Sequence, residues 1–246
     1  MSLFFLITIF VSGILAGFIG AISGGGGLIS ISLLLFLGIP PQITLASNKF
    51  GGLGMGIGGL YKYIKHNKIV WKYALWLSIA GILGSLIGSR ILIDSSPAFI
   101  KIFTSVLLVL LVPTVFIKRG FGVEHVKTSK LKEVLGYFCY FLLSIIASFF
   151  GGLGMILITV VIFFLGLPFL EASATELVSF FIFSVVSTGI FMFNGLVNYT
   201  IGILLFVGML IGGYVGAHTA IKKGSNWVKI FFAIIVIASA IKVLLT

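Results

Sequence analysis

Two glycine runs interrupt long apolar stretches of this chain and limit the folds that are open to it. The first run is Ser23-Gly24-Gly25-Gly26-Gly27, and the second is Gly151-Gly152-Leu153-Gly154. Each glycine costs a helix about 1 kcal/mol relative to alanine. A broken helix leaves backbone groups unpaired, which hydrocarbon tolerates only where the break is buried in protein or lines a polar cavity. The runs predict a binding site built from broken helices. The alternative interpretation is close helix packing through glycine.

Composition identifies the class of protein. Of the 246 residues, 60% are hydrophobic and only 9% are charged, which is typical of a polytopic membrane protein embedded in a lipid bilayer. The net charge of +11 does not indicate a nucleic-acid partner, because the basic residues cluster in short loops between apolar segments. The single cysteine, Cys139, allows no internal disulfide or metal cluster. We therefore expect no metal and no cofactor.

The second half of the chain repeats the first at an offset of 128 residues. Matching positions include glycines, a proline and a basic motif: Gly24 and Gly152, Gly26 and Gly154, Pro40 and Pro168, Gly84 and Gly212, and Lys101-Ile-Phe103 and Lys229-Ile-Phe231. In the first half, apolar segments cover 3–22, 28–37, 42–61, 73–93 and 98–117. We predict an all-α integral membrane protein with about ten transmembrane segments in two inverted five-segment repeats. The repeats are 1–117 and 134–246, joined by a basic linker at 118–133, and their broken helices should meet near the bilayer midplane.

The distribution of charge predicts the topology. If every segment crosses the membrane, the loops 62–72, 118–132 and 218–226 share one face. That face collects twelve basic residues, against three on the other: Lys62, Lys65, Lys68, Lys72, Lys118, Arg119, Lys127, Lys130, Lys132, Lys222, Lys223 and Lys229, against Arg90, Lys101 and Lys242. The positive-inside rule places the basic loops in the cytoplasm and both termini outside, in an inner or plasma membrane.

Two ionisable residues, Lys49 and Glu176, lie inside membrane segments, each shortly after a Gly-x-Pro turn. Lys49 is one residue past Asn48, the position that pairs with Glu176. An ionisable group within a membrane costs at least about 2.5–3.5 kcal/mol, so it needs a partner or a watery cavity. A lysine near helix N-termini favours an anion, whereas a glutamate there suits proton coupling. The alternative is a structural ion pair between the two, or snorkelling to an interface.

Polar side chains near these residues complete the predicted site, because hydroxyls and amides can replace water around an oxyanion. The predicted substrate-binding residues are Ser23, Gly24, Gly25, Gly26, Thr44, Ser47, Asn48, Lys49, Gly152, Gly154 and Thr175, with Glu176 for proton coupling. Each hydroxyl could equally serve helix–helix hydrogen bonding. The chain shows no catalytic or nucleotide-binding motif, so we do not expect an enzyme.

Several motifs resemble the TauE/SafE family of sulfite exporters. In the first half they are Gly17-Phe-Ile-Gly20, the run from Ser23 to Leu28, Leu37-Gly-Ile-Pro-Pro41 and Ala46-Ser-Asn48. In the second half they are Ser148-Phe-Phe-Gly-Gly-Leu-Gly154, Leu165-Gly-Leu-Pro168 and Ala174-Thr175. The resemblance covers nearly the whole chain. It implies movement of sulfite, sulfonates and related organic anions across the inner membrane.

Together these features predict a secondary transporter of small oxyanions or organosulfonates such as sulfite or sulfoacetate. We expect proton coupling and alternating access, in which one bundle rocks against the other around a fixed site. A passive anion channel and a membrane-embedded enzyme or assembly factor are the alternatives. The expected partners are a small anionic substrate, lipid and protons, and a homodimer stays open.

Overall fold

The computed structural model describes residues 3–96, 98–99, 102 and 122–244, and every regular element in these ranges is an α-helix. The helices are α1 (Leu3–Ser23), α2 (Gly26–Phe36), α3 (Pro41–Lys65), α4 (Trp71–Asp94), α6 (Lys130–Ala147), α7 (Gly154–Leu165), α8 (Phe169–Phe193) and α9 (Tyr199–Leu244). Four of them have the length and hydropathy of membrane spans: α1, α4, α8 and the part of α9 from Tyr199 to Val228. The chain is thus an all-helical protein whose helices suit a bilayer.

Both glycine runs break the chain between a long and a short helix, as predicted. α1 ends at Ser23 and α2 begins at Gly26, with Gly24 between them at a φ of 77°. In the second half the break falls between α6 and α7. One detail differs from expectation, because Gly26 and Gly27 form the first turn of α2 instead of lying in the break. The N–H groups of a first turn have no intrahelical partner in any case, so glycine disturbs the helix less there.

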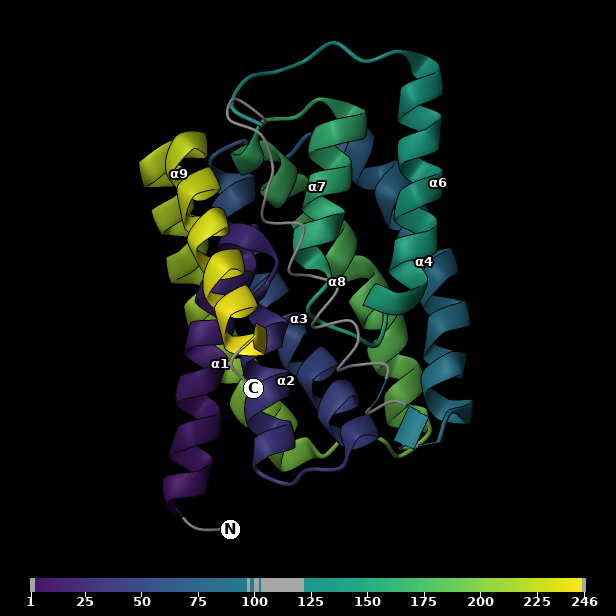
Figure 1. Cartoon of the computed structure of the whole chain (residues 1–246), viewed down its shortest axis with the longest axis vertical. Helices are drawn as coiled ribbons and strands as arrows, with labels where there is room; N and C mark the ends of the chain where they lie inside the picture. Colours follow the sequence, from purple (N-terminus) through teal and green to yellow (C-terminus); the bar gives the residue numbers. More distant parts are fainter. Residues whose placement is uncertain (1–2, 97, 100–101, 103–121, 245–246) are drawn as a thin grey trace.

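The two halves of the molecule run in opposite directions (Figure 1). α1 enters from the end that carries the N-terminus and stops near the middle, whereas α6 enters from the opposite end and also stops near the middle. The short helices α2 and α7 then turn back, each toward the end from which its preceding helix came. α3 and α8 follow, and they begin at Pro41 and Phe169, 128 residues apart.

Glycines allow the long helices to pack with their backbones in contact. A Cβ on Gly17 of α1 would collide with the backbone of Met209 on α9, and one on Gly54 of α3 would collide with the Phe206 carbonyl on the same helix. On the other side, a Cβ on Gly88 of α4 would collide with the Ile145 carbonyl of α6. These contacts confirm the predicted role of small residues in close helix packing.

Two predicted loops are partly helical. The segment 218–226 lies within α9, which is interrupted only at Gly224, where φ is 79° and ψ is 176°. A backbone of this kind suits glycine, and the chain changes direction there (Figure 1). The linker predicted at 118–133 ends earlier, because α6 begins at Lys130. The fifth predicted segment, 98–117, lies mostly outside the described residues. The count of ten segments and the inverted repeat therefore stay predictions.

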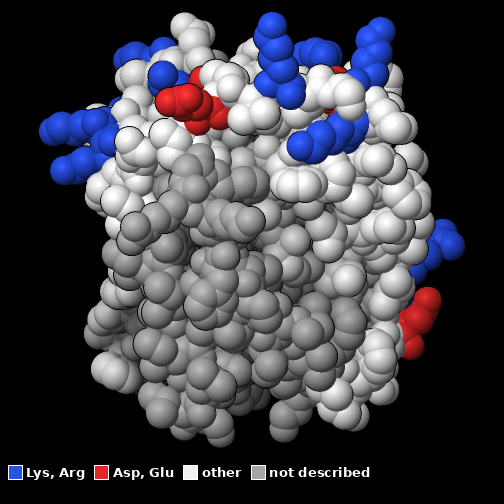
Figure 2. Space-filling model, turned by 45° about the horizontal axis from the view of Figure 1, so that its top comes forward, with Lys and Arg blue, Asp and Glu red and all other residues white. Residues whose placement is uncertain are grey.

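Charged side chains gather at one end of the molecule, the end where α6 begins (Figure 2). The exposed lysines of this end come from the end of α3, the start of α4, the segment before α6 and the part of α9 before its kink: Lys65, Lys72, Lys127, Lys130, Lys222 and Lys223. Within the described part of the chain, the opposite end carries Arg90 and Asp94 on α4. The lysines thus lie on one face, as the topology prediction requires.

Candidate functional site

The two glycine runs meet in the middle of the molecule, as predicted from the sequence. A Cβ on Gly24 would collide with the backbone of Gly154, and one on Gly154 would collide with Gly24. Gly27 and the carbonyl of Gly151 are in the same kind of contact. Only glycine lets two chain segments approach this closely, so each run needs the other.

The contact brings two helix N-termini together. α2 begins at Gly26 with Gly25 as its N-cap, and α7 begins at Gly154 with Leu153 as its N-cap. Neither N-cap offers a side-chain hydrogen bond within the described structure. The first N–H groups of both helices and the positive ends of both dipoles therefore point toward the centre. Such an arrangement favours a negatively charged ligand.

Asn48 lies beside this crossing and is almost fully buried. Its Oδ1 accepts a hydrogen bond from the Ser30 hydroxyl of α2. Its Nδ2 faces Gly151, 2.6 Å from where a Cβ on that glycine would stand. The Ser30 bond fixes the amide so that its donor group points at the second glycine run.

Lys49 is buried on the same helix, with 1% of its surface exposed. Its Nζ donates a hydrogen bond of 2.7 Å to the carbonyl of Ala147, the last residue of α6. The ammonium also lies over two rings of α8, 4.6 Å from the centroid of Phe180 and 4.4 Å from that of Phe183. A helix C-terminus and two aromatic faces together stabilise a positive charge.

Glu176 is the second buried ionisable group, with 3% of its surface exposed. It interacts electrostatically with Lys49 and lies next to the Tyr140 hydroxyl of α6. The described residues contain two ion pairs, Lys72–Glu133 and His125–Glu171, and neither involves Lys49 or Glu176. The direct ion pair weighed as the structural alternative is therefore not formed in this conformation.

A small cavity lies between these elements, with a volume of about 10 Å³. It is lined by residues of α1, α2, α3, α8 and α9 and by the second glycine run: Ala16, Gly27, Asn48, Lys49, Gly52, Met55, Gly151, Phe180 and Met209. This volume holds about one water molecule. Of the predicted substrate-binding residues, Asn48 and Lys49 line the cavity, and Glu176 does not.

The other predicted polar residues have structural partners. Ser47 Oγ accepts a 2.9 Å hydrogen bond from the N–H of Asn198, and Thr175 Oγ1 accepts one of 3.1 Å from the N–H of Val70. Both bonds connect one half of the chain to the other. The hydroxyls of Ser23 and Thr44 donate to carbonyls of their own half, those of Ile19 and Ile39. The predicted glycines Gly25, Gly26 and Gly152 pack against Met155, Ala16 and Leu28.

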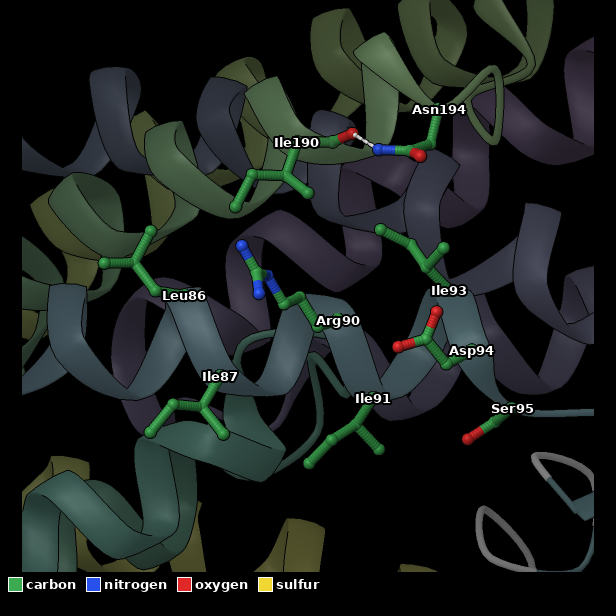
Figure 3. Close-up of a pocket in the computed structure, with 9 residues that line it drawn as sticks. All are labelled: Leu86, Ile87, Arg90, Ile91, Ile93, Asp94, Ser95, Ile190 and Asn194. Atoms are coloured by element: carbon green, nitrogen blue, oxygen red, sulfur yellow. Dashed lines mark hydrogen bonds between the residues drawn. The ribbon is translucent and has the colours of Figure 1, made fainter.

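A larger hollow of about 1220 Å³ lies elsewhere, at the end of the molecule opposite the lysines (Figure 3). Arg90 of α4 points across it toward Ile190 of α8, and Asn194 Nδ2 donates to the Ile190 carbonyl at 2.8 Å. The hollow contains none of the predicted site residues and is bordered by exposed apolar side chains such as Leu86 and Ile87. We therefore place the candidate site at the central cavity.

Sequence reasoning missed the aromatic and hydroxyl groups around the two charges. Phe180 and Phe183 hold the Lys49 ammonium, and Tyr140 lies beside Glu176. A possible signal was the pair of aromatic residues one and two turns after Glu176 in an otherwise hydroxyl-rich helix. Within the described ranges, no three His, Cys, Asp or Glu side chains are grouped so that they could hold a metal ion.

Comparisons with known proteins agree with this picture. The family described as "Sulfite exporter TauE/SafE" matches residues 9–243. A "probable membrane transporter protein ORF9" of a Sinorhizobium species is 28% identical over 245 residues, which cover 96% of this chain and 91% of that protein. A "probable membrane transporter protein" of Haemophilus influenzae is 28% identical, covering 91% and 88%. Escherichia coli YfcA, also named a probable membrane transporter protein, is 24% identical, covering 95% and 86%. No solved structure matches the chain significantly.

Proposed function

This chain belongs to the sulfite exporter TauE/SafE family, and from that premise we propose that it is a proton-coupled secondary transporter of small oxyanions or organosulfonates. Its relatives are named as membrane transporters. One observation carries the proposal for an anionic substrate. The uncapped N-termini of α2 and α7 meet beside Asn48 and Lys49, at the broken helices.

The chemistry of this centre suits a sulfite or sulfonate oxyanion. Backbone N–H groups at the two helix starts, the Asn48 amide and the Lys49 ammonium are all hydrogen-bond donors. Oxygen atoms of a sulfonate accept several such bonds at once. A carboxylate has the same charge but fewer oxygens, so we expect it to bind more weakly.

An inverted repeat and alternating access belong to the same proposal. Corresponding helices begin 128 residues apart, α2 and α7 at Gly26 and Gly154, and α4 and α9 at Trp71 and Tyr199. The hydrogen bonds of Ser47 with Asn198 and of Thr175 with Val70 are also equivalent at this offset. Each bond ties one half to the other, as a two-fold relation between the halves would require. In this arrangement the two bundles could move against each other around the glycine crossing.

The small cavity supports a mechanism with a closed state. About 10 Å³ cannot hold a sulfonate, so a substrate enters only when the bundles open. We propose that the lysine-rich end shown in Figure 2 faces the cytoplasm and that both termini lie outside. Opening toward each side in turn would carry the anion across.

The test is uptake by the purified full-length chain in proteoliposomes. Sulfite, sulfoacetate, taurine and simple carboxylates would be offered with and without an imposed pH gradient. We expect saturable uptake of sulfite or a sulfonate that increases with the gradient. Flux without saturation would indicate a channel, uptake that favours carboxylates would overturn the substrate class, and absence of any flux would favour an enzyme or assembly factor.

A further inference from the structure

Three buried polar groups without hydrogen-bond partners meet beside the candidate anion site. They are the hydroxyl of Tyr140 on α6 and, on α8, Oε1 of Glu176 and the hydroxyl of Ser179; among the described residues each lacks a partner. Tyr140 and Ser179 are fully buried, and Glu176 is 3% exposed. The Tyr140 hydroxyl lies next to both other groups. Unpaired buried polar groups cost free energy, so such a cluster calls for an explanation.

The surroundings of the cluster are apolar on every side but one. α4 approaches it at Gly81, where a Cβ would stand 3.1 Å from the Ser179 hydroxyl and 2.8 Å from Phe183. α3 contributes Lys49, which interacts with the carboxyl electrostatically. The titratable groups that face Glu176 are therefore Lys49 and Tyr140. Three oxygens beside a lysine ammonium are a poor site for a metal cation, whereas a proton needs a single oxygen.

Lys49 spans the distance between the cluster and the cavity. Lys49 lines the cavity together with Gly27 and Gly151. Its ammonium is turned toward α6 and α8, where it is held by the Ala147 carbonyl and by the rings of Phe180 and Phe183. The same side chain thus belongs to both places.

We propose that Glu176, Tyr140 and Ser179 form a proton-binding site separate from the anion cavity, and that Lys49 couples the two by moving its ammonium between them. This inference rests on the transport function proposed above. When Glu176 is ionised, its charge holds the ammonium on the side of α6 and α8. A proton that adds to the carboxylate removes that charge, and the ammonium is free to turn into the cavity and pair with the anion. One proton then accompanies one anion, and no covalent bond of the anion changes.

Linkage gives the first experiment. Because coupling between two sites is reciprocal, protons must strengthen anion binding. Sulfoacetate is a suitable ligand, since both of its acidic groups stay ionised between about pH 6 and about pH 8. We expect the purified wild-type chain to bind sulfoacetate about tenfold more tightly at the lower pH, within the usual range of coupling free energies. Glu176→Gln, which imitates the protonated carboxyl, should bind tightly at both pH values.

Matched variants separate the cluster from general effects. Glu171→Gln removes a carboxylate from the first turn of α8 that pairs with His125 instead, and it should keep the wild-type pH dependence. Tyr140→Phe should keep sulfoacetate counterflow, which needs no proton gradient, but should lower the number of protons moved per anion. Tyr137→Phe removes another unpartnered buried hydroxyl from α6, one that lies toward Glu133, and should change neither.

Each outcome bears on the proposal. Binding by Glu176→Gln that falls with pH as in the wild type would overturn it, and so would equal effects of Tyr140→Phe and Tyr137→Phe. Binding that responds to sodium instead of pH would also overturn it, because the cluster would then be a metal site. If Glu176→Gln does not fold, Lys49→Met serves instead, and its weak binding should no longer depend on pH. In all these cases saturable uptake by the wild type would leave the transporter function standing, whereas a wild type without binding or flux would end both.

Discussion

α3 and α8 occupy equivalent places in the two halves, yet they satisfy their buried polar groups differently. Both have 25 residues, and both begin directly after a proline or with one. In α3 the buried side chains of Thr44, Ser47, Asn48 and Lys49 all take part in hydrogen bonds. In α8 the described structure leaves Glu176, Ser179, Ser184 and Thr188 with an atom that has no partner.

The two helices also differ in how they pack. α3 contains six glycines, and several of them touch the backbone of α9, whereas α8 contains one glycine, Gly189, and many phenylalanines. α3 is therefore fixed through its backbone and its hydrogen bonds, and α8 keeps spare hydrogen-bonding capacity. The difference teaches that one repeat supplies a fixed binding surface and the other supplies groups that can change their protonation or their partners.

The largest expected effect concerns the glycines. In Gly54→Val the new side chain would collide with the Phe206 carbonyl of α9. Neither backbone can move without separating α3 from α9, so we expect a loss of about 3 kcal/mol or more in unfolding free energy. Gly189→Val in α8 is the matched control, since no described atom lies within 4 Å of its Cβ position. Thermal unfolding in detergent measures both, and similar losses would contradict the difference in packing.

The next effect concerns the buried lysine of α3. Lys49→Met should weaken sulfoacetate binding about tenfold to a hundredfold, because a hydrogen bond to a charged group is worth about 1.5–3 kcal/mol. Lys65→Met, at the exposed end of the same helix, should bind normally. Equilibrium binding by the folded variants is the measurement.

The double variant with Glu176→Gln tests the structural alternative. An ion pair would make each single variant unstable by about 3–5 kcal/mol, and the double variant would regain stability and uptake. We expect no such rescue, because Lys49 hydrogen-bonds the Ala147 carbonyl and is not paired directly with Glu176. Rescue of both stability and uptake would show that the assignment of the site is wrong.

Much of this site could be predicted from the sequence. Glycine runs within apolar segments indicated where helices break and meet, and charge within an apolar segment indicated Lys49 and Glu176. The sequence could not show that Glu176 lies outside the cavity. Lys49 is one residue past the equivalent of Glu176, and one residue turns a helix by about 100°, so the two side chains leave their helices in different directions.

The roles of Ser47 and Thr175 could not be predicted either. A hydroxyl bonds whichever donor or acceptor lies opposite, and for these two that donor is a backbone N–H of the other half. The aromatic residues around Lys49 come from segments that are apolar throughout, where no pattern shows which side faces a charge. Contacts between halves depend on the packed structure, and local patterns do not contain it.

The third prediction sharpens the likeness between α3 and α8. Ser47→Ala and Thr175→Val each remove the acceptor for one backbone N–H of the opposite half, so each should cost about 1 kcal/mol. The two sites lie near opposite ends of the bundle, and the double variant should show the sum of the two losses to within about 0.5 kcal/mol. Ser23→Ala, whose hydroxyl bonds its own helix at Ile19, should cost less. Unequal losses at Ser47 and Thr175 would argue against equivalent positions in an inverted repeat.

The smallest expected effect tests the spare capacity of α8 itself. Ser184→Ala and Thr188→Val remove hydroxyls that have no described partner, so unfolding free energy should stay within about 0.5 kcal/mol of the wild type or rise slightly. Thr44→Val in α3 is the comparison, because its hydroxyl donates to the Ile39 carbonyl at 3.2 Å, and it should lose about 1 kcal/mol. A loss at Ser184 or Thr188 as large as that at Thr44 would mean that these hydroxyls bind water in the folded protein. α8 would then be as fully satisfied as α3, and its unpaired groups would no longer distinguish the two repeats.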